Sequence, residues 1–285
     1  MDYIKPGQVL NQMVEAGAVK AGLSRMNMVV RGALAGAILA CATTLAFTTV
    51  AQTKLGIAGA VIFPVGFVII VLLGLELVTG SFGFIPLAVL KKKASMGQML
   101  GNYFWVILGH LLGCLVYAAL YGLTVTKMGT DMTHPLAQTL VQTAEAKTLA
   151  YRDMGGEGMA LVFIKAILCN WMVTLGAVMA FTSSSTLGKI AAMWLPIVIF
   201  FGQGFEHAVV NLFVIPAGMM LGADVGLADW WLWNQIPVLL GNFAGGALFT
   251  GILFNLSQRK SSRLNSGNPG SPLARSDASA AGKSA

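Results

Sequence analysis

Residues 204–209 read Gly-Phe-Glu-His-Ala-Val, and residues 74–79 read Gly-Leu-Glu-Leu-Val-Thr, each inside a long apolar run. Each glutamate is followed ten residues later by a proline, so one half of the chain echoes the other. A carboxylate inside a membrane span costs so much free energy that it is normally functional or stabilises freed backbone groups. A duplicated interruption in corresponding spans is the best sequence indicator of a transport site. The two segments therefore predict a transporter or channel.

The composition places the chain in a membrane. Of its 285 residues, 56% are hydrophobic and only 10% are charged, whereas soluble domains average roughly a quarter charged residues. The net charge of +7 comes from Lys and Arg that flank apolar runs, which favours a membrane over nucleic acid as the partner. His110 and His134 stand alone, and no two histidines have ligand spacing, so we expect neither a metal site nor a cofactor.

The apolar runs predict an all-α integral membrane protein with six transmembrane helices. Each run is close to or longer than the 20 or so residues that a crossing needs; the runs cover residues 27–50, 57–90, 103–125, 159–182, 190–222 and 234–256. The second and fifth are too long for one straight helix and contain Gly and Pro, so we expect broken helices there. Since each repeat (27–125 and 159–256) has three spans, the second copy is inverted.

Shorter matching segments predict how the residues of the two repeats align with each other. Gly101-Asn102-Tyr103 matches Gly241-Asn242-Phe243, and Arg31 of the first span matches Lys165 of the fourth. Lys165 enters its span about 9 Å from the end by helix rise. It either extends to the interface or supplies a fixed charge that attracts anions, and the sequence leaves both readings open.

The basic residues predict that both termini lie in the cytoplasm. With the N-terminus inside, most Lys and Arg fall on the cytoplasmic side, while the outer loops hold only Lys54, Lys127, Lys147 and Arg152. We expect a multi-pass protein of the inner (plasma) membrane. Residues 1–26 predict an amphipathic helix on the inner surface. Residues 257–285, rich in Ser, Gly and Pro, predict a disordered cytoplasmic tail.

His207 and Thr79 are the leading candidates for a substrate path. An imidazole in a dry constriction can offer a cation to an anion or pass it a proton, although a neutral core histidine is the alternative. The Thr79 hydroxyl could donate to a carboxylate or nitrite oxygen, or simply cap the following half-helix. We expect Glu76 and Glu206 to be structural and to accept hydrogen bonds from backbone N–H groups that the breaks free.

Two asparagines and three phenylalanines of these spans each have a functional and a structural interpretation. Asn211 follows His207 by four residues and Asn170 lies in the fourth span, so either could contact a path or connect two helices. Phe63, Phe67 and Phe200 precede the breaks at helical spacing. Their rings could form a dewetted constriction or face lipid and neighbouring helices.

Three stretches resemble the formate/nitrite transporter family. Residues 204–216 (GFEHAVVNLFVIP) are close to its long fifth-span motif, residues 74–80 resemble its second-span motif, and Cys169-Asn170-Trp171 resembles its fourth. The resemblance covers roughly Val9 to Leu256. It departs from the family at Leu77-Val78, where bacterial members commonly have Leu-Phe.

The resemblance implies an aquaporin-like protomer, a homopentamer, and small monovalent anions or their acids as cargo. It implies that His207 is central with Thr79 opposite and Asn170 and Asn211 nearby, and that the apolar constrictions are Phe63, Phe67 and Leu77 on one side and Phe200 on the other. Some members carry a lysine before the fourth span, for which Lys147 is a candidate. Either Lys147 or Lys165 would then charge the outer vestibule.

We therefore predict a formate channel, with possible proton coupling through His207 and with nitrite or hydrosulfide as alternative cargo. The conjugate acid of an anion loses much less on dehydration than the anion does, so proton sharing would lower the barrier. A channel for water or glycerol is a second reading. A membrane-embedded enzyme that uses Glu206 and His207 as an acid-base pair is a third, and we expect no enzyme because no nucleophile or metal set accompanies the pair.

Overall fold

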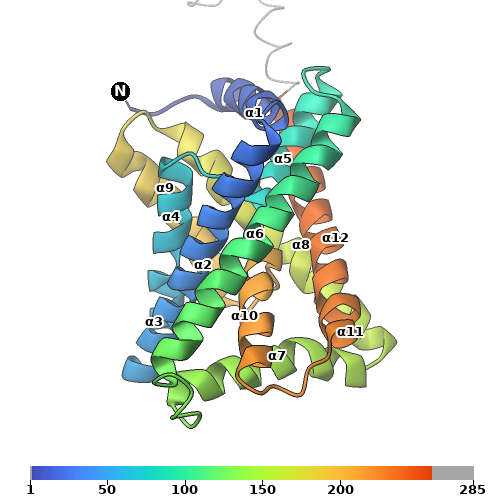
Figure 1. Cartoon of the computed structure of the whole chain (residues 1–285). Helices are drawn as coiled ribbons and strands as arrows, with labels where there is room; N and C mark the ends of the chain where they lie inside the picture. Colours follow the sequence, from blue (N-terminus) through green and yellow to red (C-terminus); the bar gives the residue numbers. More distant parts are fainter. Residues whose placement is uncertain (1, 259–285) are drawn as a thin grey trace, which may run out of the picture.

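The computed structural model describes residues 2–258, and these residues form an all-helical bundle (Figure 1). Four helical stretches are long and apolar enough to cross a membrane. They are α2 (Arg25–Thr53), α6 (Met96–Val125), α8 (Gly156–Met179) and a composite stretch from Leu227 to Gln258. That stretch comprises α11 (Leu227–Trp230), η2 (Trp231–Gln235), α12 (Ile236–Ala244) and η3 (Gly245–Leu253), of which η2 and η3 are π-helical. Most of the tail predicted at 257–285 lies outside the described residues.

The second and fifth apolar runs are broken helices, as their Gly and Pro content predicts. The first comprises α3 (Gly56–Ile62), α4 (Pro64–Leu72) and α5 (Val78–Leu90), and the other comprises α9 (Thr186–Gly202) and α10 (Ala208–Met220). Gly74 and Gly204 sit in the breaks with φ of 64° and 63°. Glycine alone adopts this left-handed conformation at little cost, which explains why each motif begins with glycine. We call residues 73–77 break 1 and residues 203–207 break 2.

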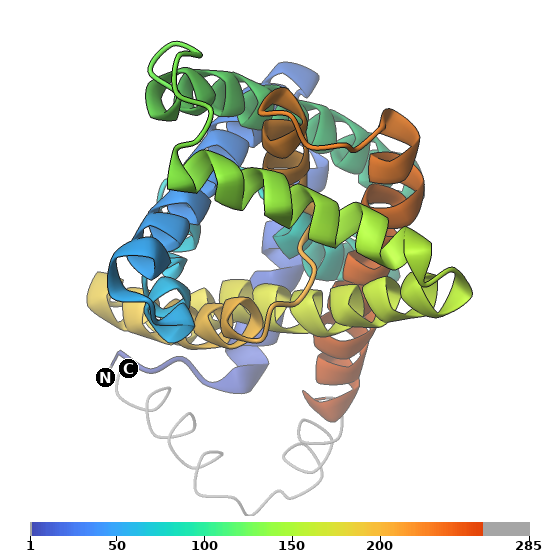
Figure 2. The same ribbon diagram turned by 90° about the horizontal axis from the view of Figure 1, so that it is seen from below.

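Two further helices cover opposite ends of the bundle. At one end α1 (Pro6–Ala21) packs on α5, with Gly17 so close to the Phe84 carbonyl that a Cβ would lie 2.2 Å from its oxygen. At the other end α7 (Pro135–Asp153) lies across the helices (Figures 1 and 2) and packs on α10. Residues 126–158, expected from the sequence to be an outer loop, thus contain a helix. Its buried residues, Ala137, Leu140, Ala144, Thr148 and Tyr151, do have helical spacing.

Small residues bring α2 and α6 into close contact. A Cβ on Gly109 would lie 2.3 Å from the Val29 carbonyl oxygen, and one on Gly113 would lie 1.9 Å from that of Ala33. Such approach of two backbones is typical of helix pairs in membranes. It places His110 of α6, which is fully buried, directly against α2.

The contacts give a register between the two halves that differs from the sequence expectation. Asn102 donates to the Lys20 carbonyl at 2.9 Å, and Asn234 donates to the Lys147 carbonyl at 2.8 Å. Asn102 therefore corresponds to Asn234, and the expected match of Asn102 with Asn242 is wrong by eight residues. The Gly-Asn pairs on which that match rested occupy different places in their helices.

Candidate functional site

His207 and Thr79 meet between the two breaks. The Nε2 atom of His207 lies 3.0 Å from the hydroxyl oxygen of Thr79, and both side chains are buried. His207 also caps α10, because its Nδ1 accepts the Val210 backbone N–H at 3.2 Å. A backbone N–H can only donate, so Nδ1 carries no proton and Nε2–H donates to Thr79. The hydroxyl hydrogen of Thr79 can then donate to a third group.

The carbonyl of Thr79 is held from the fourth span. Asn170 Nδ2 and Thr174 Oγ1 each donate to this oxygen at 3.1 Å. Asn170 Nδ2 also donates to the Asn242 carbonyl at 2.6 Å. Gly246 makes room for this arrangement, since a Cβ there would lie 2.7 Å from both donor atoms. Asn170 thus contacts the site through the backbone of α5.

Glu206 is surrounded by side-chain donors. Lys147 forms an ion pair with it at 2.8 Å, and Tyr151 and Asn211 each donate to it at 2.8 Å. Asn234 adds a longer contact at 3.4 Å. The expectation that backbone N–H groups satisfy this carboxylate is therefore wrong, because side chains from α7, α10 and η2 reach it first. Asn211 faces Glu206 instead of sharing the surroundings of His207.

Lys165 reaches the same carboxylate only indirectly. Its Nζ donates to the Tyr151 hydroxyl at 3.2 Å, and that hydroxyl donates to Glu206. Burial, together with the negative charge of Glu206, raises the pKa of Tyr151. The phenol therefore stays protonated and serves as a donor. Of the two lysines considered for the vestibule, Lys147 contacts Glu206 directly and lines the cavity described below.

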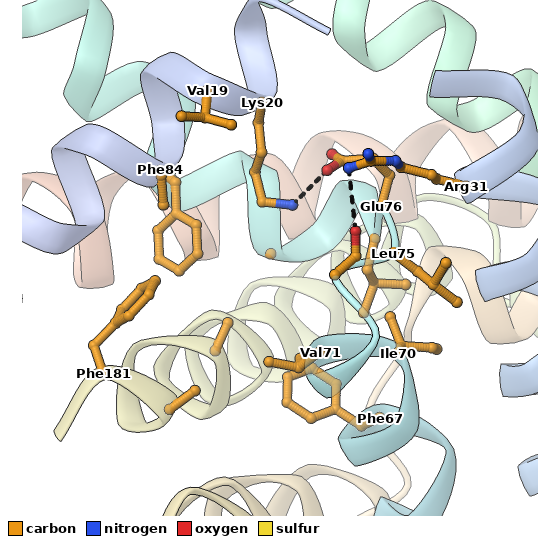
Figure 3. A pocket seen from close by; sticks show the side chains of 16 residues that line it. Val19, Lys20, Arg31, Phe67, Ile70, Val71, Leu75, Glu76, Phe84 and Phe181 are labelled. Carbon is orange, nitrogen blue, oxygen red and sulfur yellow. Dashed lines mark hydrogen bonds and ion pairs between the residues drawn. The ribbon is translucent and has the colours of Figure 1, made fainter. Parts of the chain in front are cut away.

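Glu76 has a different environment. Its Oε1 accepts from Lys20 at 2.9 Å (Figure 3), while its buried Oε2 has no hydrogen-bond partner among the described residues. Here too the expected backbone donors are replaced by a side chain. Arg31 donates to the Gly74 carbonyl at 3.4 Å, so it contacts the backbone of break 1.

Two cavities lie on either side of the breaks. The Lys20 cavity, of about 300 Å³, is lined by 16 residues (Figure 3), which are mostly apolar and include Lys20, Arg31, Phe67, Glu76 and Leu77. The Lys147 cavity, of about 200 Å³, is lined among others by Lys147, Phe200 and His207. Phe63 lines neither cavity; it stacks on Phe201 with ring centroids 4.0 Å apart and meets Phe200 edge-on at 5.6 Å. It supports the wall that Phe200 forms.

His110 is a further functional candidate. Its Nε2 accepts the Val78 backbone N–H at 3.1 Å, and its Nδ1 lies 2.8 Å from the Gly32 carbonyl oxygen. Both partners of His110 are backbone groups, which the spacing of histidines along the sequence does not reveal. Asn242 does the equivalent work at break 2, where its Oδ1 accepts the Ala208 N–H at 2.9 Å. A polar side chain in the middle of an apolar span was the signal available for both residues.

Comparisons with known proteins agree with this architecture. The chain is 32% identical to the uncharacterized transporter YrhG of Bacillus subtilis over 271 residues, which cover 92% of this chain and 97% of that protein. It is 30% identical to the formate channel BtFdhC of Bacillus thuringiensis, over 89% of this chain and 95% of the relative.

Solved structures share the fold. An ion channel of the FNT family superposes with a TM-score of 0.74 at 26% identity and covers 88% of this chain and 99% of its own. A pentameric formate channel with formate bound superposes with a TM-score of 0.66 at 24% identity and covers 82% of this chain and 97% of its own. At this identity the likeness shows a shared fold alone. The sequence profile described as formate/nitrite transporter matches residues 7–256. The chain therefore belongs to the formate/nitrite transporter family.

Proposed function

We propose that this protein is a channel for small monovalent anions or their conjugate acids, with formate as the first candidate cargo. Nitrite and hydrosulfide are the alternatives within the same function. The relative named a formate channel supports this assignment. The observation that carries it is the contact of His207 with Thr79, because it lies where the two broken helices meet and because His207 lines the Lys147 cavity.

The proposed architecture is six crossings in two inverted repeats, with both termini in the cytoplasm of an inner-membrane homopentamer. Matching contacts support the repeat. Lys20 pairs with Glu76 as Lys147 pairs with Glu206, and the residues that contact the two lysine carbonyls match as well. The pentamer is suggested by the similarly folded pentameric formate channel.

The lining suggests how the barrier would be lowered. Lys147 and Lys20 attract an anion toward the breaks, while Phe67, Leu77 and Phe200 remove its water. An anion without water is costly in such surroundings, and its conjugate acid much less so. The Thr79 hydroxyl donates to the anion, and His207 fixes the orientation of that hydroxyl by donating its Nε2–H to the hydroxyl oxygen. His207 can pass a proton on only after it has taken up a second one at Nδ1, because the neutral ring carries a single proton. Uptake is therefore expected to rise as the pH falls.

Flux of labelled formate into proteoliposomes tests this proposal. Wild-type protein should carry formate, and His207→Asn should reduce the flux and change its pH response. His134→Asn is the matched control, because His134 caps α7 through Nδ1 and lines neither cavity. Equal flux and equal pH response in wild type and His207→Asn would remove His207 from the mechanism. Competition by nitrite and hydrosulfide at two pH values would rank the cargo.

A catalytic pair of Glu206 and His207 has less support. The Glu206 carboxylate is bonded to Lys147, Tyr151 and Asn211, whereas His207 is bonded to Thr79 and Val210. The two side chains thus have separate partners, and the cavity that His207 lines is not lined by Glu206. Vesicle swelling in osmotic shock without dependence on anions would instead favour a channel for water or glycerol.

A further inference from the structure

We propose that His110 is a positioning residue for the substrate path and holds the Thr79 hydroxyl in place through the first turn of α5. This inference rests on the proposed function, since its effect would appear as altered anion flux. His110 lines neither of the two cavities and is fully buried between α2, α5 and α6. It would therefore act on the path without touching the cargo.

The partners of His110 define one tautomer. The Val78 N–H can only donate, so Nε2 must be the unprotonated nitrogen. The Gly32 carbonyl can only accept, so Nδ1 must carry the proton. His207 has the opposite assignment, with the proton on Nε2. The two buried imidazoles are thus neutral tautomers of different kinds, each fixed by a backbone N–H at the start of a half-helix.

The residue that His110 bonds, Val78, directly precedes Thr79 in the sequence. Val78 is the first residue of α5, and its N–H is among the donors that a helix start leaves unpaired. Thr79 follows directly, and its hydroxyl meets His207 at 3.0 Å. Removal of the acceptor at position 110 would leave a buried N–H unpaired, which favours fraying of this turn. Fraying would shift the Thr79 hydroxyl relative to His207.

After break 2, the backbone N–H at the start of the half-helix is bonded by a shorter side chain, that of Asn242. Asn242 accepts the Ala208 N–H with Oδ1 and donates to the Ala166 carbonyl with Nδ2 at 2.8 Å. His110 repeats this pattern, with Nε2 as acceptor and Nδ1–H as donor to Gly32. The acceptor nitrogen of an imidazole lies one bond further from the backbone than the amide oxygen of asparagine. Asparagine at position 110 would therefore fall short of Val78.

Two variants separate positioning from simple packing. Glutamine at position 110 can place Oε1 near the position of Nε2 and accept the Val78 N–H, whereas leucine fills similar space without an acceptor. We expect His110→Leu to reduce formate flux about tenfold, the order expected when a buried donor loses its partner. We expect His110→Gln to recover flux to within about threefold of wild type, because it restores that acceptor. Equal losses in folded His110→Gln and His110→Leu proteins would overturn the proposal.

A double-mutant cycle tests the route through Thr79. If His110 acts by placing the Thr79 hydroxyl, His110→Leu should cost almost nothing further in a Thr79→Val background. Losses that multiply in the double variant would show that His110 acts independently of Thr79, and would overturn the positioning role.

Nitrogen-15 NMR of histidine-labelled full-length protein provides a readout that does not need transport. We expect His110 to show an unprotonated Nε2 and His207 an unprotonated Nδ1, with each signal assigned by its loss in the corresponding His→Gln variant. The same tautomer at both positions, or a charged His110, would refute the assignment. If wild-type protein carried no formate, the proposed function would fail, while this spectrum would still decide the state of His110.

Discussion

The two breaks have the same backbone path and the same glutamate, yet their surroundings differ in polarity. At break 2 the Glu206 carboxylate receives hydrogen bonds from Lys147, Tyr151 and Asn211 at 2.8 Å. At break 1 the Glu76 carboxylate has only Lys20, and its Oε2 atom has no partner among the described residues. The comparison indicates that break 2 is the firmer anchor and that break 1 depends on fewer contacts.

The breaks also differ in the polar group that each contributes. His207 corresponds in position to Leu77, and Thr79 corresponds to Val209, so each break together with the first helix turn after it supplies one polar side chain and one apolar one. The Thr79 carbonyl accepts two hydrogen bonds, from Asn170 and Thr174, whereas the Val209 carbonyl has a thiol contact with Cys114 at 3.8 Å. The two helix starts are therefore held through different groups, α5 mainly through the Thr79 carbonyl and α10 through the N–H groups of Ala208 and Val210.

The largest difference between the breaks should appear when the glutamates are neutralised. We expect Glu206→Gln to lower the free energy of unfolding by about 3 kcal/mol, because it removes one partner of a buried ion pair and places an amide N–H among donors. Glu76→Gln should cost less, about 2 kcal/mol, because it breaks a similarly buried ion pair with Lys20 but affects no other hydrogen-bond donor. Denaturant unfolding in detergent, followed by tryptophan fluorescence, measures both. A loss for Glu76→Gln as large as that for Glu206→Gln would contradict the comparison.

The two polar groups can be tested one at a time. Thr79→Val keeps the shape of the side chain and removes the hydroxyl, so we expect formate flux to fall about tenfold, the effect of one hydrogen bond lost in the transition state. Thr79→Ser retains the hydroxyl and serves as the control. Flux through Thr79→Val that matches Thr79→Ser in proteoliposomes would show that the hydroxyl makes no contribution.

The support of the Thr79 carbonyl should be sensitive to one methyl group. In Gly246→Ala the new Cβ would lie 2.7 Å from the Asn170 and Thr174 donor atoms, so we expect a loss of about 2 kcal/mol from overpacking. Gly101→Ala is the matched control, since nothing lies within 4 Å of a Cβ there. Thermal unfolding of the two variants compares them, and an equal midpoint would argue against close packing at Gly246.

The smallest expected effect concerns Tyr151. Its raised pKa favours the protonated phenol in the folded protein, so its contribution to stability is complete below about pH 10 and is lost as the pH rises further. We expect Tyr151→Phe to cost about 1 kcal/mol at neutral pH, the value of one hydrogen bond. Above pH 10 the difference between wild type and variant should narrow. Unfolding measured at pH 8 and at pH 11 tests the sign, which would be wrong if the difference widened.

The sequence predicted the helix breaks well because their signals are local. Glycine, glutamate and a later proline recur in both halves, and the structure places a break at each motif. The partners of the glutamates could not be predicted from the sequence, since Lys147 lies 59 residues from Glu206 and Lys20 lies 56 residues from Glu76. The local sequence supplies only backbone N–H groups as donors for these carboxylates, and the distant lysines become neighbours only through the fold.

Other misses have identifiable causes. The helical spacing of α7 was present between Pro135 and Asp153, but its polar residues made it resemble a loop between two strongly apolar spans. His110 was judged by distance along the chain from the other histidines, although its role is to bond a backbone N–H 32 residues away. Pairing by sequence spacing fails wherever the partner is a main-chain group on another helix.

The N-termini of two half-helices meet at the breaks, and this has an electrical consequence. The helices α5 and α10 begin at Val78 and Ala208, and the His207–Thr79 contact joins their first turns. Each helix start carries roughly half a positive elementary charge from its aligned peptide dipoles. No side-chain replacement removes that potential. The main chain would thus favour negative cargo over positive, and the side chains would only distinguish one anion from another.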